Sequence, residues 1–356
     1  SGYAAAPVCS PTRYSILYGQ TCARLRKTLV RGPNLVDHTQ LSLPQAIKRA
    51  DARYVCAHFG KWHIAVEPET VGFDVSDGKT TNREGGFNNG KAVEWSGYAA
   101  DDPKLVDHVT DRGIAFMREQ VRAGRPFFLQ LSHYAVHSDI VFRESTLREV
   151  ERWPRGRTHQ HAGYAAMIKD LDDAVGRLMR AFDDLNLADN TYVFFVSDNG
   201  GMPMIPPKRR DGVPYERALN APLRSGKWDL TEGGLRVPFF VAGPGIAAGI
   251  QCDTPVVTYD LLPTFTDIAG ASAFTSPTLD GASLLPLLHD PRSASVKRPL
   301  GDTLVFHFPH YNRMGPGGSP SAARRGPCGC SVGSETRACR PAGASRKRSA
   351  GRGAAG

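Results

Sequence analysis

The residues best suited to chemistry lie in short segments spread along the chain, beginning with Cys9-Ser10-Pro11-Thr12-Arg13. This segment holds a lone cysteine followed by a proline at the second position and an arginine at the fourth. A cysteine can act as a nucleophile or be modified, and arginine can stabilise an anion. Taken alone, such a cysteine is more often a small buried thiol. The other segments must therefore decide between these interpretations.

Charged and polar side chains follow three apolar segments that we expect to be strands. They are Lys61 and His63, His133 and His137, and Asp198 and Asn199, while Lys227 lies in a further glycine-flanked turn. Histidine suits proton transfer near neutral pH, lysine supplies a compact positive charge, and oxygen ligands suit calcium or magnesium. Each also has an ordinary explanation, because most lysines are merely solvated and Asp-Asn-Gly is a common turn.

Helical and strand patterns alternate and predict how these residues are positioned. We expect strands over 54–57, 127–131, 192–196 and 237–242, and helices over 43–49, 107–121 and 164–185. The run at 192–196 is almost continuously apolar, which favours a central strand buried on both faces. The alternation predicts an α/β fold with a mostly parallel central sheet flanked by helices. Functional residues of such sheets gather at the carboxyl ends of the strands.

Charge and composition exclude several classes of protein. The net charge is +9, but residues 313–356 hold nine Lys/Arg and one acid, so the first 312 residues carry only +1. This balance gives no support for nucleic-acid binding by the main domain. No apolar run has the length of a transmembrane helix, and no signal peptide is visible. The seven cysteines show no zinc spacing, and we expect Cys22 and Cys56 to be plain buried thiols.

Five segments, in this order along the chain, resemble the type I sulfatase family, which is formylglycine-dependent, arylsulfatase-like and part of the alkaline-phosphatase-like superfamily. The resemblance covers about residues 3–312 and implies an alkaline-phosphatase-like fold. The segments that carry it are Cys9-Ser10-Pro11-Thr12-Arg13, Gly60-Lys61-Trp62-His63, 133–137, Ser197-Asp198-Asn199-Gly200, and Leu223-Arg224-Ser225-Gly226-Lys227 with Glu232-Gly233-Gly234-Leu235-Arg236-Val237-Pro238.

The resemblance implies a role for each site residue in the hydrolysis of a sulfate monoester. A formylglycine-generating enzyme would oxidise Cys9 to formylglycine, whose hydrate is the nucleophile. Arg13 would hold that hydrate, and His63 would hydrogen-bond to it. The remaining roles are sulfate contact by Lys61 and Lys227, sulfate binding and leaving-group protonation by His137, and coordination of Ca²⁺ (Mg²⁺ possible) by Asp198, Asn199 and the modified Cys9. His133 fits a core position better.

The sequence departs from the family pattern at both ends. The resemblance implies adjacent aspartates on a strand well before the cysteine motif, whereas only eight residues precede Cys9. We therefore expect residues 1–312 to form a catalytic domain, incomplete at its N-terminus, whose fold lacks its first strand. Residues 313–356 are expected to be a disordered, basic tail rich in Arg, Gly, Ala and Pro. A frameshift is our hypothesis for that tail, and the alternatives are a genuine disordered tail and a nucleic-acid-binding arm.

Two alternatives to sulfatase activity stay open. One is a phosphonate or phosphate monoester hydrolase of the same superfamily, and the other is a catalytically inactive sulfatase fragment. The expected partners are a sulfated small molecule or glycan and the formylglycine-generating enzyme, with no nucleic acid and no membrane. The family implies a periplasmic or secreted location.

Overall fold

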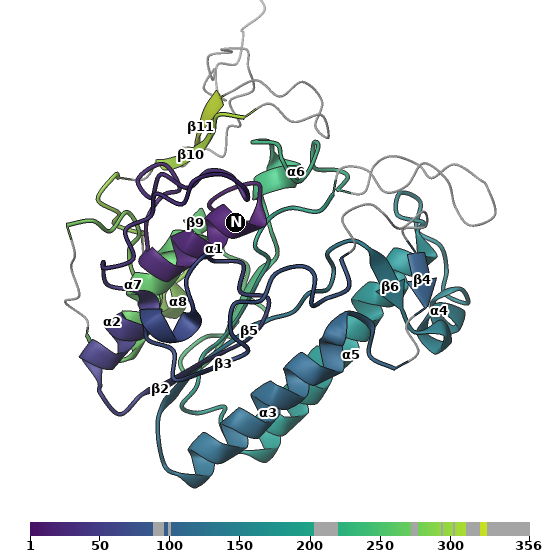
Figure 1. Cartoon of the computed structure of the whole chain (residues 1–356), viewed down its shortest axis with the longest axis horizontal. Helices are drawn as coiled ribbons and strands as arrows, with labels where there is room; N and C mark the ends of the chain where they lie inside the picture. Colours follow the sequence, from purple (N-terminus) through teal and green to yellow (C-terminus); the bar gives the residue numbers. More distant parts are fainter. Residues whose placement is uncertain are drawn as a thin grey trace, which may run out of the picture.

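Helices alternate with short strands along most of the chain (Figure 1). The computed structural model describes residues 1–87, 96–98, 101–202, 220–271, 277–292, 295–301, 303–310 and 321–325. The strands are β1 (Gly2–Tyr3), β2 (Val55–Gly60), β3 (Val75–Ser76), β4 (Ser96–Tyr98), β5 (Phe127–Ser132), β6 (Ile140–Phe142), β7 (Val193–Val196), β8 (Phe239–Ala242), β9 (Val256–Val257), β10 (Leu304–Phe308) and β11 (Ser321–Arg325).

The helices include all three that the sequence predicts, at 43–49, 107–121 and 164–185. The α-helices are α1 (Cys9–Tyr18), α2 (Leu43–Ala50), α3 (Val106–Arg122), α4 (Glu144–Val150), α5 (Ala162–Asp184), α6 (Glu232–Leu235), α7 (Leu261–Ile268) and α8 (Leu285–His289). Three short 3₁₀ helices are η1 (Pro68–Val71), η2 (Pro103–Leu105) and η3 (Thr258–Asp260).

The sheet that positions the site has the strand order β3-β2-β5, and all of its strands are parallel. Its register pairs Val55 with Phe127 and Gly60 with Ser132. The carboxyl ends of β2 and β5 therefore lie side by side, as the sequence predicts. The chain segments that follow both strands start from this common edge.

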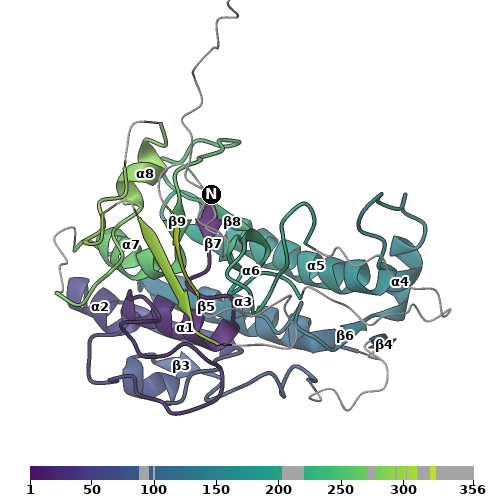
Figure 2. The same cartoon turned by 90° about the horizontal axis from the view of Figure 1, so that it is seen from above.

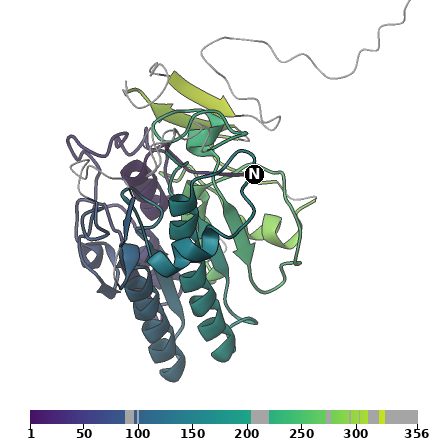
Figure 3. The same ribbon diagram turned by 90° about the vertical axis from the view of Figure 1, so that its right-hand side faces the viewer.

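The long helices α3 and α5 lie side by side, in both Figure 1 and Figure 3. The buried face of α3 supplies Val109 and Phe116, which pack with Ala57 and Phe59 of β2. Burying such side chains contributes roughly 1.5–3 kcal/mol each to the stability of the fold. This packing fixes β2 against α3 and so holds the start of the site.

The expectation that 192–196 forms a central strand buried on both faces is wrong. Strand β7 pairs antiparallel with β8, and in the part of the chain that the structure describes it has no second strand neighbour. Phe195 is 42% exposed and Phe240 on β8 is 65% exposed, with their rings 6.1 Å apart. An apolar run cannot distinguish a strand inside a sheet from one whose partners are missing on one side.

Helix α1 packs into the cluster of buried side chains that includes α2. Tyr14, Leu17 and Tyr18 pack in one buried cluster with Ile47 of α2 and with Trp62. The helix ends at Gly19, which takes the left-handed conformation (φ 64°) typical of a helix C-cap. Figure 2 shows α1, α2 and α7 gathered at one end of the molecule and α4 at the other.

The described C-terminal residues form an antiparallel ribbon of β10 and β11, in which Leu304 pairs with Arg325. Apart from 321–325, the segment 313–356, for which we predict a tail, lies outside the described residues. Among the helices of the described residues, none is both long and apolar enough to cross a membrane.

Candidate active site

Cys9 is the first residue of α1, and its side chain is buried. The residue is 2% exposed, and its Sγ lies 3.4 Å from Nδ1 of His63. Thr12 fixes the approach to the helix, because its hydroxyl oxygen accepts a hydrogen bond from the amide of Ala6 at 3.2 Å. The amino end of a helix favours negative charge. Position 9 is therefore built to hold an anionic or strongly polar group.

Arg13 lies one helical turn after Cys9 and ties three segments together. Its Nε donates to Oδ2 of Asp198 at 2.8 Å, and NH2 lies 2.8 Å from the same oxygen. Its NH1 donates to the carbonyl oxygen of Lys61. The arginine thus joins α1 to the segment after β2 and to the segment after β7.

Lys61 and His63 lie in the tight turn that follows β2, here called turn 60–63. Gly60 has φ 89°, and a Cβ at this position would lie 2.3 Å from the carbonyl oxygen of Ser132. The amide of Lys61 donates to that same carbonyl at 2.7 Å. Only glycine allows β2 and β5 to approach so closely. The turn sends the Lys61 side chain into the protein, where Nζ lies 3.9 Å from Oδ2 of Asp198.

His137 and Lys227 come from two further loops. His137 follows β5, and its Nδ1 lies 2.7 Å from the carbonyl oxygen of Ser138, so Nδ1 carries a proton and Nε2 is left for other contacts. The ring of Phe87 packs edge-on against it, with centroids 5.1 Å apart. Lys227 is buried, and its amide donates to the carbonyl oxygen of Gly201 at 2.8 Å.

Electrostatic interactions place these groups in one cluster around Cys9. Burial raises the pKa of the Cys9 thiol, but Lys61, Lys227 and the hydrogen bond from His63 outweigh burial and lower the pKa to about 5. Burial likewise raises the pKa of Asp198, and Arg13, Lys61 and Lys227 together hold it well below its usual range. The cluster favours anions because its positive charges outnumber its carboxylate.

Burial and the two lysines act in the opposite direction on the basic groups. Burial lowers the pKa of His137 to about 2, assisted by the positive charges of Lys227 and Lys61. Burial also lowers the pKa of Lys61, while Cys9 and Asp198 oppose that change. An anionic ligand would relieve both effects, because it would add negative charge where cations crowd together.

Asp198 and Asn199 offer the oxygen ligands that a hard divalent cation prefers, but two residues are too few to hold one. Oδ1 of Asn199 is fully buried and accepts no hydrogen bond, while its Nδ2 donates to the carbonyl oxygen of Gly200 at 2.9 Å. An unsatisfied buried amide oxygen beside a carboxylate fits a calcium or magnesium ligand. Calcium takes about six to eight oxygens. The described residues hold no group of three or more His, Cys, Asp or Glu that could bind a metal.

The loop that carries Lys227 is fastened to the segment after β7 by contacts that the sequence analysis did not foresee. Nδ2 of Asn220 donates to the carbonyl oxygens of Gly201 and Ser225, at 3.0 and 2.9 Å. A Cβ on Gly200 would lie 1.8 Å from the carbonyl oxygen of Gly233. Asn220 lies two residues before Pro222, but no residue pattern signals that its side chain binds these two carbonyl groups.

The structure brings together every residue that the sequence analysis placed in the site, and it leaves His133 out. Nε2 of His133 lies 3.0 Å from the hydroxyl of Thr110 on α3, and burial lowers the pKa of this histidine to about 4. His133 is thus a neutral histidine packed against a helix, in agreement with the sequence-based preference for a core position. Seven of the site residues interact with one another, and Asn199 lies beside them as the residue that follows Asp198; the seven are Cys9, Arg13, Lys61, His63, His137, Asp198 and Lys227.

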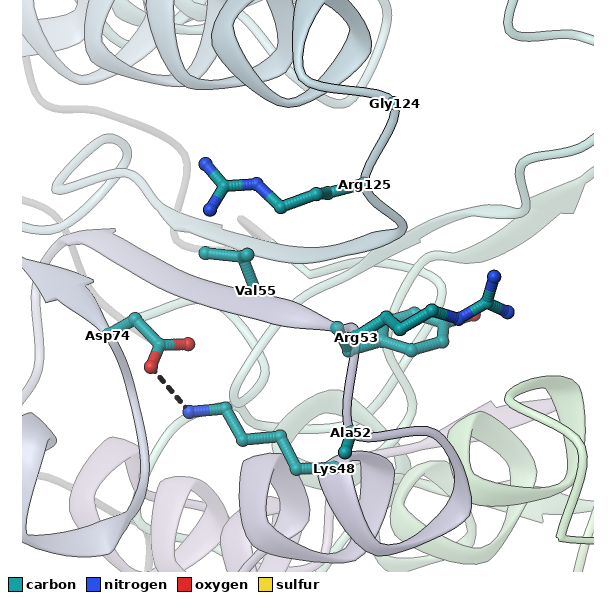
Figure 4. A pocket seen from close by; sticks show the side chains of 8 residues that line it. Lys48, Ala52, Arg53, Val55, Asp74, Gly124 and Arg125 are labelled. Atoms are coloured by element: carbon teal, nitrogen blue, oxygen red, sulfur yellow. Dashed lines mark hydrogen bonds and ion pairs between the residues drawn. The ribbon is translucent and has the colours of Figure 1, made fainter.

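A separate hollow of about 440 Å³ lies near the amino end of β2, at the opposite end from turn 60–63 (Figure 4). Its positive charges are already paired. Nζ of Lys48 lies 2.6 Å from Oδ1 of Asp74, a contact drawn as a dashed line in Figure 4. NH2 of Arg53 lies 2.6 Å from Oδ2 of Asp51. This hollow therefore lacks the buried excess of positive charge that is found around Cys9.

A comparison with known families identifies the family of this chain. A family model described as Sulfatase matches residues 1–271. The chain belongs to the sulfatase family. Among curated relatives of this sulfatase-family chain, the N-acetylgalactosamine-6-sulfatase of Homo sapiens is 28% identical over 343 residues, covering 85% of the chain and 61% of the relative. A sulfatase of Formosa agariphila is 34% identical over 221 residues, covering 58% of the chain and 37% of the relative.

Solved structures show that the sulfatase-family chain has the alkaline-phosphatase-like fold. The complex of Ps i-CgsB with k-i-k-neocarrahexaose matches with a TM-score of 0.68 at 24% identity, covering 91% of this chain and 73% of that one. The phosphonate monoester hydrolase SpPMH from Silicibacter pomeroyi matches with a TM-score of 0.62 at 18% identity, covering 91% and 77%. The chain spans 61% of the human relative's length.

Proposed function

We propose that this sulfatase-family chain hydrolyses a sulfate monoester, with formylglycine made from Cys9 as its nucleophile. One observation carries the proposal: Cys9 lies at the amino end of α1, 3.4 Å from His63, within a buried cluster that includes Arg13, Lys61 and Lys227. Such a cluster can hold an anionic ester against a nucleophile, since fixed positive charges in a buried site stabilise developing negative charge.

Each residue of the cluster has its own proposed role in the reaction. Lys61 and Lys227 bind the sulfate oxygens, and Arg13 holds both Asp198 and the carbonyl of Lys61 in place. His63 holds the group at position 9. As its hydrate, the formylglycine would supply one hydroxyl that attacks sulfur and a second whose loss of a proton reforms the aldehyde and releases sulfate.

His137 is the proposed proton donor to the leaving oxygen. In the free protein it is neutral, since its pKa is lowered to about 2 by burial and the two lysines. A bound sulfate ester neutralises those lysines and so raises the pKa of His137. The Nε2 atom, which is not used in the contact with Ser138, can then take up a proton and pass it to the alcohol.

A calcium ion bound by Asp198, Asn199 and position 9 would polarise a sulfate oxygen and orient the nucleophile. Asp198 and Asn199 are too few to hold calcium, so the remaining ligands have to come from water, substrate or residues outside the described part. If no such ligands exist, the inactive-fragment alternative is favoured. The Mg²⁺ alternative has the same requirement for oxygen ligands.

The substrate and setting follow from the relatives and remain proposals. We infer a sulfated glycan or small sulfate ester as substrate, a formylglycine-generating enzyme as the maturation partner, and a secreted or periplasmic location. Residues 1–312 are the proposed catalytic domain. A phosphonate or phosphate monoester is the alternative substrate, since the fold is shared with a phosphonate monoester hydrolase.

The test is to produce the chain together with a formylglycine-generating enzyme, supply calcium, and compare turnover of an aryl sulfate, an aryl phosphonate and an aryl phosphate. We expect the sulfate to be the best substrate and Cys9→Ala to abolish its turnover. Cys22→Ala is the matched control, because Cys22 is a buried free thiol outside the charged cluster. Preference for the phosphonate would support the alternative substrate, and no turnover of any ester would support the inactive fragment.

A further inference from the structure

Turn 60–63 carries two site residues, yet its backbone is strained. His63 has φ 58°, in the left-handed region that is unfavourable for a residue with a Cβ, whereas Gly60 takes φ 89° without strain. A strained turn keeps its shape only when surrounding groups fix it. The groups that hold this turn therefore determine the directions of the Lys61 and His63 side chains.

The segment after β3 provides most of that support. The hydroxyl of Thr80 donates to the carbonyl oxygen of Gly60 at 2.5 Å and accepts from the amide of Trp62 at 2.8 Å. The carbonyl oxygen of Thr80 accepts from the amide of His63 at 2.8 Å. Oδ2 of Asp77 accepts from the amide of Gly60 at 2.7 Å. Four backbone groups of the turn are thus bound by two residues.

Asp77 is itself held from the far side. NH2 of Arg112 on α3 lies 3.2 Å from Oδ1 of Asp77, and the guanidinium stacks on the ring of Phe59, 4.6 Å from its centroid. The carboxylate can therefore keep Oδ2 directed at Gly60. Asp77, Thr80 and Arg112 also line a hollow of about 340 Å³ behind the turn, so changes there need not disturb the packed core.

We propose that Thr80, assisted by Asp77, is the positioning residue that holds Lys61 and His63 in their working geometry. The proposal rests on the proposed function only for the roles of Lys61 and His63. Thr80 touches neither substrate nor the reacting atoms. It acts because one hydroxyl both donates to and accepts from turn 60–63, a combination that valine lacks and serine retains.

The first test measures backbone protection, which does not depend on activity. In Thr80→Val, hydrogen exchange of the Trp62 amide should become at least about tenfold faster, because its acceptor is gone. Thr80→Ser should behave as the original chain does. Thr81→Val is the matched control: the Thr81 hydroxyl bonds Glu84 at the surface, 3.0 Å away, and its loss should leave exchange in turn 60–63 unchanged.

The second test separates positioning from general stability. With the matured protein, Thr80→Val should lower kcat/KM for an aryl sulfate by roughly 10²-fold, the scale expected when a catalytic group moves by about 1 Å. Inhibition by inorganic sulfate should weaken in parallel, because Lys61 is displaced. Thr80→Ser should restore both. If Thr80→Val fails to fold, Asp77→Ala serves in its place and should accelerate exchange of the Gly60 amide, because its side-chain acceptor is gone.

Unchanged exchange in turn 60–63 in both Thr80→Val and Asp77→Ala would overturn the proposal. So would a loss of kcat/KM in Thr80→Val that Thr80→Ser fails to restore. A chain that shows the exchange pattern but no sulfatase activity would keep the positioning inference and reject the proposed function. The two ideas can therefore fail independently.

Discussion

Protein made without the modifying enzyme keeps a thiol at Cys9, and we expect that thiol to ionise far below the usual range. Lys61, Lys227 and the His63 hydrogen bond outweigh burial and lower its pKa from 9.0 to about 5. At pH 7 the thiol would then be about 99% ionised, against about 3% for an ordinary cysteine of pKa ~8.5. Cys22 and Cys56 are internal controls, since burial raises the pKa of each to about 12.

This shift also predicts how stability depends on pH. Because the pKa of Cys9 is lower in the folded state, the unfolded chain binds more protons between about pH 5 and 9. The contribution is fully present above pH 9 and is lost as the pH falls towards 5. At pH 7 it amounts to about 3 kcal/mol, of which roughly 2 kcal/mol disappears by pH 5.

The assay compares urea unfolding of the unmodified protein with that of Cys9→Ala at pH 7 and pH 5, together with thiolate absorbance as the pH is varied. The difference in unfolding free energy between the two proteins should shrink at pH 5, and a single thiolate should titrate near pH 5. A difference that does not change with pH, or the absence of a thiolate near pH 5 that Cys9→Ala removes, would refute the electrostatic picture of the site.

Three further changes test the contacts that hold the site. Arg13→Ala should cost about 3 kcal/mol of unfolding free energy because it removes the cation that pairs directly with Asp198, whereas Arg53→Ala, which breaks an exposed pair, should cost far less by urea unfolding. Gly200→Ala should cost about 3 kcal/mol or more of unfolding free energy by thermal unfolding, since its Cβ would lie 1.8 Å from a carbonyl oxygen. Gly176→Ala on α5 should not destabilise the protein, because its Cβ would lie 3.6 Å from the nearest atom. Asn199→Ala should weaken calcium binding about tenfold or more in calorimetry, while Asn190→Ala, in an exposed turn, should not.

Equal losses for the members of a pair would contradict these predictions. If Arg13→Ala and Arg53→Ala cost the same, Arg13 does not support the site. If Gly200→Ala is tolerated, the loops around Asn199 are not packed as described. Unchanged calcium affinity in Asn199→Ala would remove Asn199 from the metal site.

The sequence predicts the strands that lead into the site and their parallel arrangement. The segments 54–57 and 127–131 are recognisable as strands, and β2 and β5 do lie parallel with their carboxyl ends together. The sequence analysis does not predict helix α1, although Pro11 in its first turn and Gly19 at its end are ordinary helix signals. The residues of the cysteine motif were interpreted only for their chemistry, so the helix that they begin was not predicted.

Other features of the site and the fold depend on tertiary contacts, which no local sequence pattern predicts. Thr80 lies far from its targets in sequence, and its hydroxyl acts on backbone groups, which have no side-chain signature. The burial of β7 was wrongly predicted because burial depends on neighbouring strands rather than on the strand's own residues. Lys227 was recognised from its glycine-flanked motif, but Asn220, which fastens its loop, was not.

The most direct test of the central claim is mass spectrometry of the peptide containing Cys9, taken from protein made with a formylglycine-generating enzyme. The account predicts that this peptide loses the mass difference between a thiol and an aldehyde, while peptides containing Cys22 and Cys56 keep their thiols. The modification should appear together with turnover of an aryl sulfate. An unmodified Cys9 in protein that nevertheless hydrolyses the ester would contradict the assignment of Cys9 as the nucleophile's source.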